Sequence, residues 1–169
     1  MTVEINAAGT ITGLQPNGIS SQPVFPGQVL QVVQETTNVP VVVASTSYTD
    51  TGVTGTITPT SATSKILVTI NQHTFLDRDS DDVDALLQLF RDTTSILDFP
   101  RFTSGLEINS STKTKMGSLQ TFSYLDSPST TSAITYKTQG RVNTTANNGA
   151  VVYQSANTFS IITLMEIAG

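Results

Sequence analysis

Short runs in which apolar residues alternate with hydroxyl-bearing ones recur along this chain, and turn residues separate them. In one such run, Val53, Gly55 and Ile57 fall on one face and the intervening threonines on the other. A period of two is typical of β-strands. Similar runs start near residues 28, 65, 119, 133, 151 and 159. This spacing predicts an all-β fold, an antiparallel two-sheet β-sandwich or jelly roll of about 8 to 10 strands over residues 28–169.

The segment 83–91 fits two kinds of element. Four apolar residues in it have the i, i+3, i+4, i+7 spacing of an amphipathic helix, with Ser80 as a candidate N-cap. As a strand, alternate side chains over 85–90 would face opposite ways, and a turn at 92–94 would lead into a return strand over 95–99. Because every other run reads as β, the hairpin is favoured over the helix.

Residues 1–27 differ from the rest because glycine or proline recurs every few positions, which predicts an irregular, extended N-terminal arm. A flexible terminus is one interpretation. The other is an ordered arm that docks on a neighbouring subunit or a larger particle, which its apolar content favours. The side chains expected to make those contacts are Val3, Ile5, Ile11, Leu14, Val24 and Phe25.

The C-terminal run 159–167 is apolar on both faces. Ile162 and Leu164 alternate with a second apolar set that includes Ile161 and Met165. Two apolar faces predict a strand at the centre of a sheet whose second face meets another subunit. We therefore place Ile162 and Leu164 among the expected intersubunit contacts.

Charge is scarce, since only 12% of the residues are charged whereas Thr and Ser number 29 and 18. The net charge of −5 argues against a nucleic-acid partner. Five acids and one base lie within 77–84, so the rest of the chain is nearly neutral. Few charges remain to protect the sheet edges, and partner subunits are therefore expected to cover them.

Several classes of site are not expected from this sequence. No apolar run is long enough to cross a membrane as a helix, and residues 1–20 lack the features of a signal peptide. The chain has no cysteine, which excludes thiol catalysis and cysteine-ligated zinc. Phosphate-binding glycine loops are also absent, so we expect no cofactor.

His73 is the single histidine, and no Gly-x-Ser-x-Gly motif accompanies it, so a nucleophilic triad is not expected. Asp77, Asp79 and Asp81 match the first three ligands of an EF-hand loop, but the Gly and Glu required later in that loop are missing. The three aspartates are a calcium candidate beside the alternative of a solvated acidic loop. We expect no catalytic residues and no enzymatic activity.

Several segments resemble virion proteins of tailed bacteriophages, of the fibre and decoration type found in marine and cyanobacterial phages. They are GQVLQVVQ (27–34), STSYTDTG (45–52), ITPTSATSKILV (57–68), LFRD (89–92), YLDSP (124–128), TYK (135–137) and ITLMEI (162–167). The resemblance implies a β-sandwich or jelly-roll module on the virion surface, commonly a homotrimer, and brings no catalytic residues with it.

Two functions follow as expectations. The first is a homotrimeric capsid decoration, cement or head-fibre protein that attaches to capsid or tail proteins through its arm, because only 27 residues precede the module. The second is a short tail-fibre tip that recognises host surface glycans. Its candidate loops are 77–84, 104–115 and 143–149, which are rich in hydroxyls and amides.

Overall fold

The computed structural model describes residues 4–5, 11–12, 24–78, 83–100 and 114–169. Ten strands of the described residues build the two sheets of the sandwich. The eight longer ones are β3 (Val29–Thr37), β5 (Thr49–Ile57), β6 (Lys65–Arg78), β7 (Ala85–Arg91), β8 (Thr94–Asp98), β9 (Thr114–Asp126), β10 (Ile134–Val142) and β12 (Ser160–Ile167). Shorter elements are β1 (Glu4–Ile5), β2 (Ile11–Thr12), β4 (Val41–Val43), β11 (Ala150–Tyr153) and the 3₁₀ turns η1 (Ala146–Asn148) and η2 (Ser155–Asn157).

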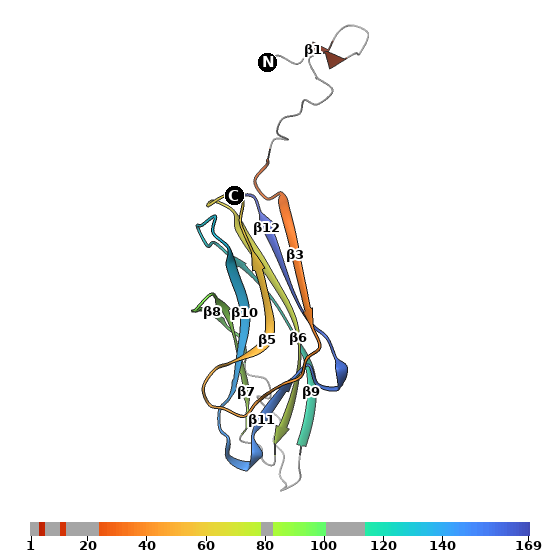
Figure 1. Ribbon diagram of the computed structural model, residues 1–169, viewed down its shortest axis with the longest axis vertical. Coiled ribbons are helices and arrows are strands. Elements are labelled where there is room, and N and C mark those ends of the chain that lie inside the picture. Colours follow the sequence, from red (N-terminus) through yellow and green to blue (C-terminus); the bar gives the residue numbers. More distant parts are fainter. Residues whose placement is uncertain (1–3, 6–10, 13–23, 79–82, 101–113) are drawn as a thin grey trace.

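Strand pairing defines a jelly roll, as predicted. The smaller sheet has the order β5-β10-β7-β8, and the larger has the order β3-β12-β6-β9. All of these pairs are antiparallel. Beyond the end of β12, β11 and then β4 take its place beside β6. The strands run along the long axis of the molecule (Figure 1).

The core lies between the two sheets and is built by the alternation seen in the sequence. In β10, Ile134, Tyr136 and Thr138 point inward and are buried, whereas Thr135 and Lys137 point outward. The strand β7 obeys the same rule, because Ala85, Leu87 and Leu89 are buried. Side chains from both sheets thus form one cluster.

The hairpin prediction for 83–91 is confirmed. β7 and β8 pair with Arg91 opposite Thr94, so a two-residue turn joins them. Asp92 occupies this turn with a φ of 53°, a left-handed conformation that aspartate tolerates better than most residues. Its side chain accepts a hydrogen bond from the Thr135 amide at 2.9 Å, which ties the turn to β10.

The structure differs from the sequence analysis in two places. The prediction of an arm without regular structure over 1–27 is wrong at β1 and β2, which pair with Ile5 opposite Ile11. The short strand β4 was not predicted at all. It has only three residues and directly follows Pro40, so no alternation is long enough to signal it.

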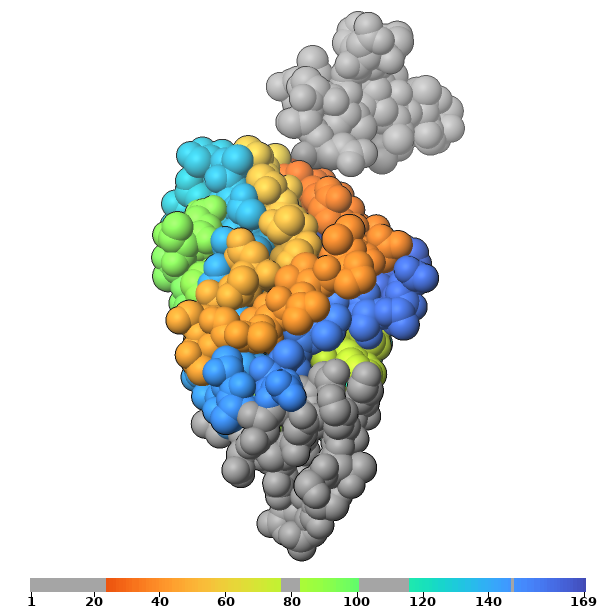
Figure 2. Space-filling model, turned by 60° about the horizontal axis from the view of Figure 1, so that its bottom comes forward, coloured from red at the N-terminus to blue at the C-terminus, as the bar shows by residue number. Residues whose placement is uncertain are grey.

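The sandwich has two sides along which the edge strands of the two sheets face each other, and different residues cover each side. On one side, β3 and β4 lie at the edge of the larger sheet and β5 at the edge of the smaller. Atoms of residues 24–50, orange in Figure 2, form a continuous band there beside the blue C-terminal part. On the other side the rings of Phe99 and Phe122 stack with centroids 3.9 Å apart, which joins the end of β8 to β9.

Glu166 is a buried charge that fixes the edge strand β3. Its carboxylate accepts hydrogen bonds from Gln31 Nε2 at 2.6 Å and from the amide and hydroxyl of Thr60, both at 2.7 Å. Burial by itself would raise the pKa of Glu166. The Ser64 hydroxyl beside it and the donors of Gln31 and Thr60 outweigh burial and lower the pKa to about 2.

We expect the stability that Glu166 provides to be lost in acid. Because its pKa falls from 4.5 to about 2 on folding, this contribution is complete above pH 4.5 and disappears as the pH drops toward 2. Its size at pH 7 is about 3 kcal/mol. Urea unfolding of wild type and Glu166→Gln between pH 2 and 7 tests this. The stability difference between the two proteins should shrink in acid, and a difference that is constant with pH would contradict the assignment.

Candidate interaction surface

The calcium candidate can be followed only at Asp77 in the part of the chain that the structure describes. No group of three or more His, Asp or Glu side chains there is placed to hold a metal ion. Asp77 lies near the end of β6, and Asp79 and Asp81 fall outside the described residues. His73 lies on β6 opposite Leu119 of β9, and its backbone amide donates to Ser160 Oγ at 3.0 Å.

The predicted contacts of the arm can be followed only in part. Val24 and Phe25, just before β3, expose 58% and 65% of their surface. Ile5 and Ile11 lie in the β1–β2 pair, and Val3 and Leu14 fall outside the described residues.

Among the described residues, no helix is long and apolar enough to cross a membrane.

The assignment of Ile162 and Leu164 to a subunit contact is wrong. Both side chains are buried between the sheets, with exposures of 1% and 0%, and Gly55 of β5 packs against them. The other face of β12 points away from the core and carries Ile161 and Met165, which are half-buried. The sequence pattern showed two apolar faces, but which of them meets the second sheet depends on packing.

The larger sheet therefore turns an apolar row toward solvent. Val32, Met165, Leu67 and Leu125 lie side by side on β3, β12, β6 and β9, in register across the sheet. Val32 is 55% exposed and Leu125 48%. We call these four residues the apolar row.

A second apolar row lies further along β6. Val42, Val152 and Phe75 are neighbours on β4, β11 and β6. Val42 is 64% exposed. Along β6, the polar residues Thr69, Asn71 and His73 lie between Leu67 of the apolar row and Phe75 of the second row.

The row next to the apolar row is made of uncharged polar groups that bond to each other. Gln34 Nε2 donates to Thr163 Oγ1 at 3.0 Å, and the hydroxyls of Thr69 and Ser123 lie 3.3 Å apart. One position further, Thr121 donates to Asn71 Oδ1 at 2.9 Å. These groups form hydrogen bonds with one another, and none of them is charged. The surface between the two apolar rows is therefore polar and neutral.

We call the outward surface of the larger sheet the outer face. It consists of Val32, Gln34, Thr36, Val42, Leu67, Thr69, Asn71, His73, Phe75, Gly117, Leu119, Thr121, Ser123, Leu125, Val152, Ile161, Thr163 and Met165. None of these eighteen residues is Asp, Glu, Lys or Arg. Lys65, at the start of β6, points the same way at the near edge of this set. A wide, neutral surface with large exposed apolar side chains is typical of a protein–protein contact.

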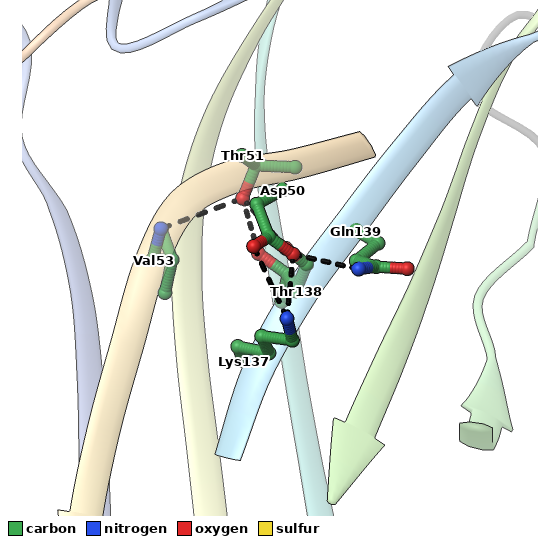
Figure 3. Close-up of polar contacts among 6 residues, drawn as sticks. All are labelled: Asp50, Thr51, Val53, Lys137, Thr138 and Gln139. Atoms are coloured by element: carbon green, nitrogen blue, oxygen red, sulfur yellow. Dashed lines mark hydrogen bonds and ion pairs between the residues drawn. The ribbon is translucent and has the colours of Figure 1, made fainter. Parts of the chain in front are cut away.

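The opposite surface of the molecule, on the smaller sheet, has a different chemistry (Figure 3). Lys137 Nζ lies 2.9 Å from Asp50 Oδ1, and Gln139 Nε2 donates to the same oxygen at 2.6 Å. Partial burial would raise the pKa of Asp50, but the bonds from Gln139 and Lys137 lower it below its usual range. This paired, charged surface is suited to contact with water, so the outer face is the candidate interaction surface.

The two ends of the sandwich are also distinct. At the near end, the start of β3 is bound to the C-terminus, because Gly27 N donates to Ala168 O and Ala168 N to Gln28 O, both at 2.8 Å. At the far end, Arg78 pairs with Thr114. Figure 1 places the C-terminus and the start of β3 together, and the ends of β6 and β10 at the opposite end.

All three predicted recognition loops start or finish at this far end. Pairing places Asp77 next to Ala150 and Ala85 next to Val142, so the loop 143–149 and the flanks of 77–84 and 104–115 share it. Residues 79–82 and 101–113 lie outside the described residues.

The chain was compared with protein-family models, curated proteins and solved structures. No family model matches the chain, and no curated protein is significantly similar to it. Among solved structures it is similar to VP2 of infectious bursal disease virus in a subviral particle, with 10% identity and a TM-score of 0.30 over 82% of this chain and 38% of that one. A structure of the Gt strain of the same virus gives 9% and 0.30, over 92% and 42%. The chain thus spans less than half of either protein, and at this TM-score the likeness adds no argument.

Proposed function

We propose that this protein is a structural subunit of a tailed-phage virion, a homotrimeric decoration, cement or head-fibre protein that attaches to the particle through its N-terminal segment. The observation that carries the proposal is the neutral outer face with its apolar row. The resemblance of segments along 27–169 to phage virion proteins supports the virion setting. Jelly rolls also occur in viral capsid proteins, which is an analogy at the level of the fold.

The register of the outer face supports a symmetry axis parallel to the strands. Rotation about such an axis leaves the height of each residue unchanged. The apolar row of one copy therefore meets the apolar rows of the other copies, and the hydroxyl rows meet each other. Three copies with their outer faces turned inward would bury the exposed parts of Val32 and Leu125, in a row that has no charged side chain.

The same arrangement supports attachment at one end. An axis along the strands brings the near ends of all copies together, and with them the chain segments that precede β3. Val24 and Phe25 expose large apolar surfaces at that end. The far-end loops would then point away from the particle.

Introducing a charge into the apolar row tests the assembly. Leu67→Lys and Met165→Lys are expected to convert a trimer into a folded monomer, because each would bury unpaired charges at the interface. Light scattering after size exclusion should give three times 17.9 kDa for wild type and 17.9 kDa for the variants.

Thr54→Lys is the matched control, since Thr54 points outward on the smaller sheet. It should remain trimeric. A wild-type protein that is monomeric at every concentration, or a Thr54→Lys variant that dissociates like the others, would overturn the proposed interface. Immunogold electron microscopy of intact virions tests the location on the particle separately.

A further inference from the structure

A groove at the far end of the smaller sheet has the chemistry of a ligand site that the assembly role does not use. It has a volume of about 380 Å³ and is lined by Tyr48, Leu86, Gln88, Asp98 and Arg141, and by the buried Leu87 and Phe99. The lining side chains come from β7, β8, β10 and the segment before β5. This volume is within the range that binds small molecules.

Arg141 is the main recognition group in this groove. Its guanidinium lies over the Tyr48 ring, 5.2 Å from the centroid, and this cation–π contact holds it in place. Among the described residues, Arg141 forms no ion pair with an acid, unlike Lys137 on the same strand. A half-buried guanidinium without a carboxylate partner keeps its donors for an anionic ligand.

The other polar groups in the groove suit hydroxyls. Gln88 donates through Nε2 to Asp98 Oδ1, which fixes both side chains. This leaves Asp98 Oδ2 and Gln88 Oε1 as acceptors, and ligand hydroxyls are the donors that fit them. Leu86, which points outward from β7 opposite Arg141, contributes the apolar surface, and Leu87 and Phe99 lie buried beneath it.

We propose that this groove binds a carboxylate-bearing sugar. The carboxylate would pair with Arg141, the hydroxyls would donate to Gln88 and Asp98, and the C–H face of the ring would lie on Leu86. One guanidinium beside one aspartate matches a ligand with a single negative charge better than a phosphate or a polyanion, which Asp98 would repel.

The position of the groove agrees with such a role. It lies on the smaller sheet, whereas the proposed trimer contact is on the larger one, so assembly would leave the groove open. It also lies at the far end, away from the proposed attachment. Binding itself does not depend on the proposed assembly, because every group in the groove comes from one chain.

Methyl β-glucuronide and methyl β-glucoside, which differ only at C6, a carboxylate in the first and a hydroxymethyl group in the second, are the test ligands. In titrations to about 20 mM followed by amide NMR shifts, we expect the glucuronide to shift residues around the groove and the glucoside to bind about tenfold more weakly. Arg141→Gln should reduce glucuronide affinity about tenfold or more, to that of the glucoside.

Lys137→Gln is the matched control, because it removes the same charge from the same strand outside the groove. It should leave affinity unchanged. The absence of glucuronide shifts at the groove, equal binding of the two sugars, or an equal effect of Lys137→Gln would overturn the proposal. The monomeric Met165→Lys variant should bind as wild type does, so failure of the assembly proposal and failure of this one are distinguishable.

Discussion

Asp126→Ala is expected to lose about 3 to 5 kcal/mol of the free energy of unfolding at pH 7, because it leaves a charge and a hydroxyl without their partner. Arg91 Nη1 donates to both oxygens of Asp126, at 3.0 and 2.9 Å, and Tyr136 Oη donates to one of them at 2.7 Å. Asp126 is only 6% exposed, and Tyr136 is fully buried.

This cluster joins the two sheets near the turn between β7 and β8. Asp126 is the last residue of β9 in the larger sheet, whereas Arg91 and Tyr136 belong to the smaller sheet. Burial, followed by the bond to Asp126, raises the pKa of Tyr136, so its hydroxyl remains a donor at any physiological pH. Loss of the carboxylate therefore removes both contacts at once.

Two further variants make this prediction specific. Tyr136→Phe removes one neutral donor and should cost about 1 kcal/mol. Asp50→Ala breaks an exposed ion pair, with Lys137, and should cost less than about 1 kcal/mol. Urea unfolding measures all three. Equal losses for Asp126→Ala and Asp50→Ala would show that burial of the pair has no effect.

Much of the fold was predictable because alternation is a local property. The inward and outward sets of β5, β7 and β10 follow from the sequence, and so does the hairpin at Asp92. The sheet order was not predictable in the same way, because β3, β12, β6 and β9 come from distant parts of the chain. Their register decides which side chains become neighbours.

The candidate surface was likewise predictable only in its local features. Met165 and Leu67 could each be assigned to a strand face from the sequence. The sequence could not show which face of β12 is buried, because Ile162 and Met165 are both apolar. The buried charges were also missed. Glu166 and Asp126 look like ordinary surface acids until the fold brings Gln31 and Arg91 to them.

We assign the two proposed roles, assembly and ligand binding, to opposite surfaces of this jelly roll. The larger sheet has apolar and uncharged polar side chains across its outer face, with Lys65 only at the near edge, which suits permanent burial against identical copies. The smaller sheet pairs Asp50 with Lys137 and keeps Arg141 unpaired with any acid of the described residues. A charged, hydrated surface with one open groove suits reversible contact with a small polar ligand.

Gly140→Ala is expected to destabilise the core by about 3 kcal/mol, at the upper end of the usual cost of overpacking. Gly140 points inward from β10, and a Cβ atom there would lie 2.0 Å from Tyr153 Oη and 2.6 Å from its Cζ. The Tyr153 ring is buried, so it cannot move aside without opening the core, and among the described residues its hydroxyl has no hydrogen-bond partner.

That unpartnered hydroxyl allows a test of the mechanism. Tyr153→Phe alone should not lower stability, because it removes a buried polar atom that makes no hydrogen bond within the described part of the chain. In the Gly140→Ala background the same change removes the atom nearest to the new methyl group and should recover about 1 kcal/mol. Gly117→Ala is the control, since its nearest contact is an ordinary 3.5 Å to Phe75. If the two glycine variants lose equal stability, or if Tyr153→Phe rescues nothing, then loss of strand flexibility and not the clash with Tyr153 accounts for the effect.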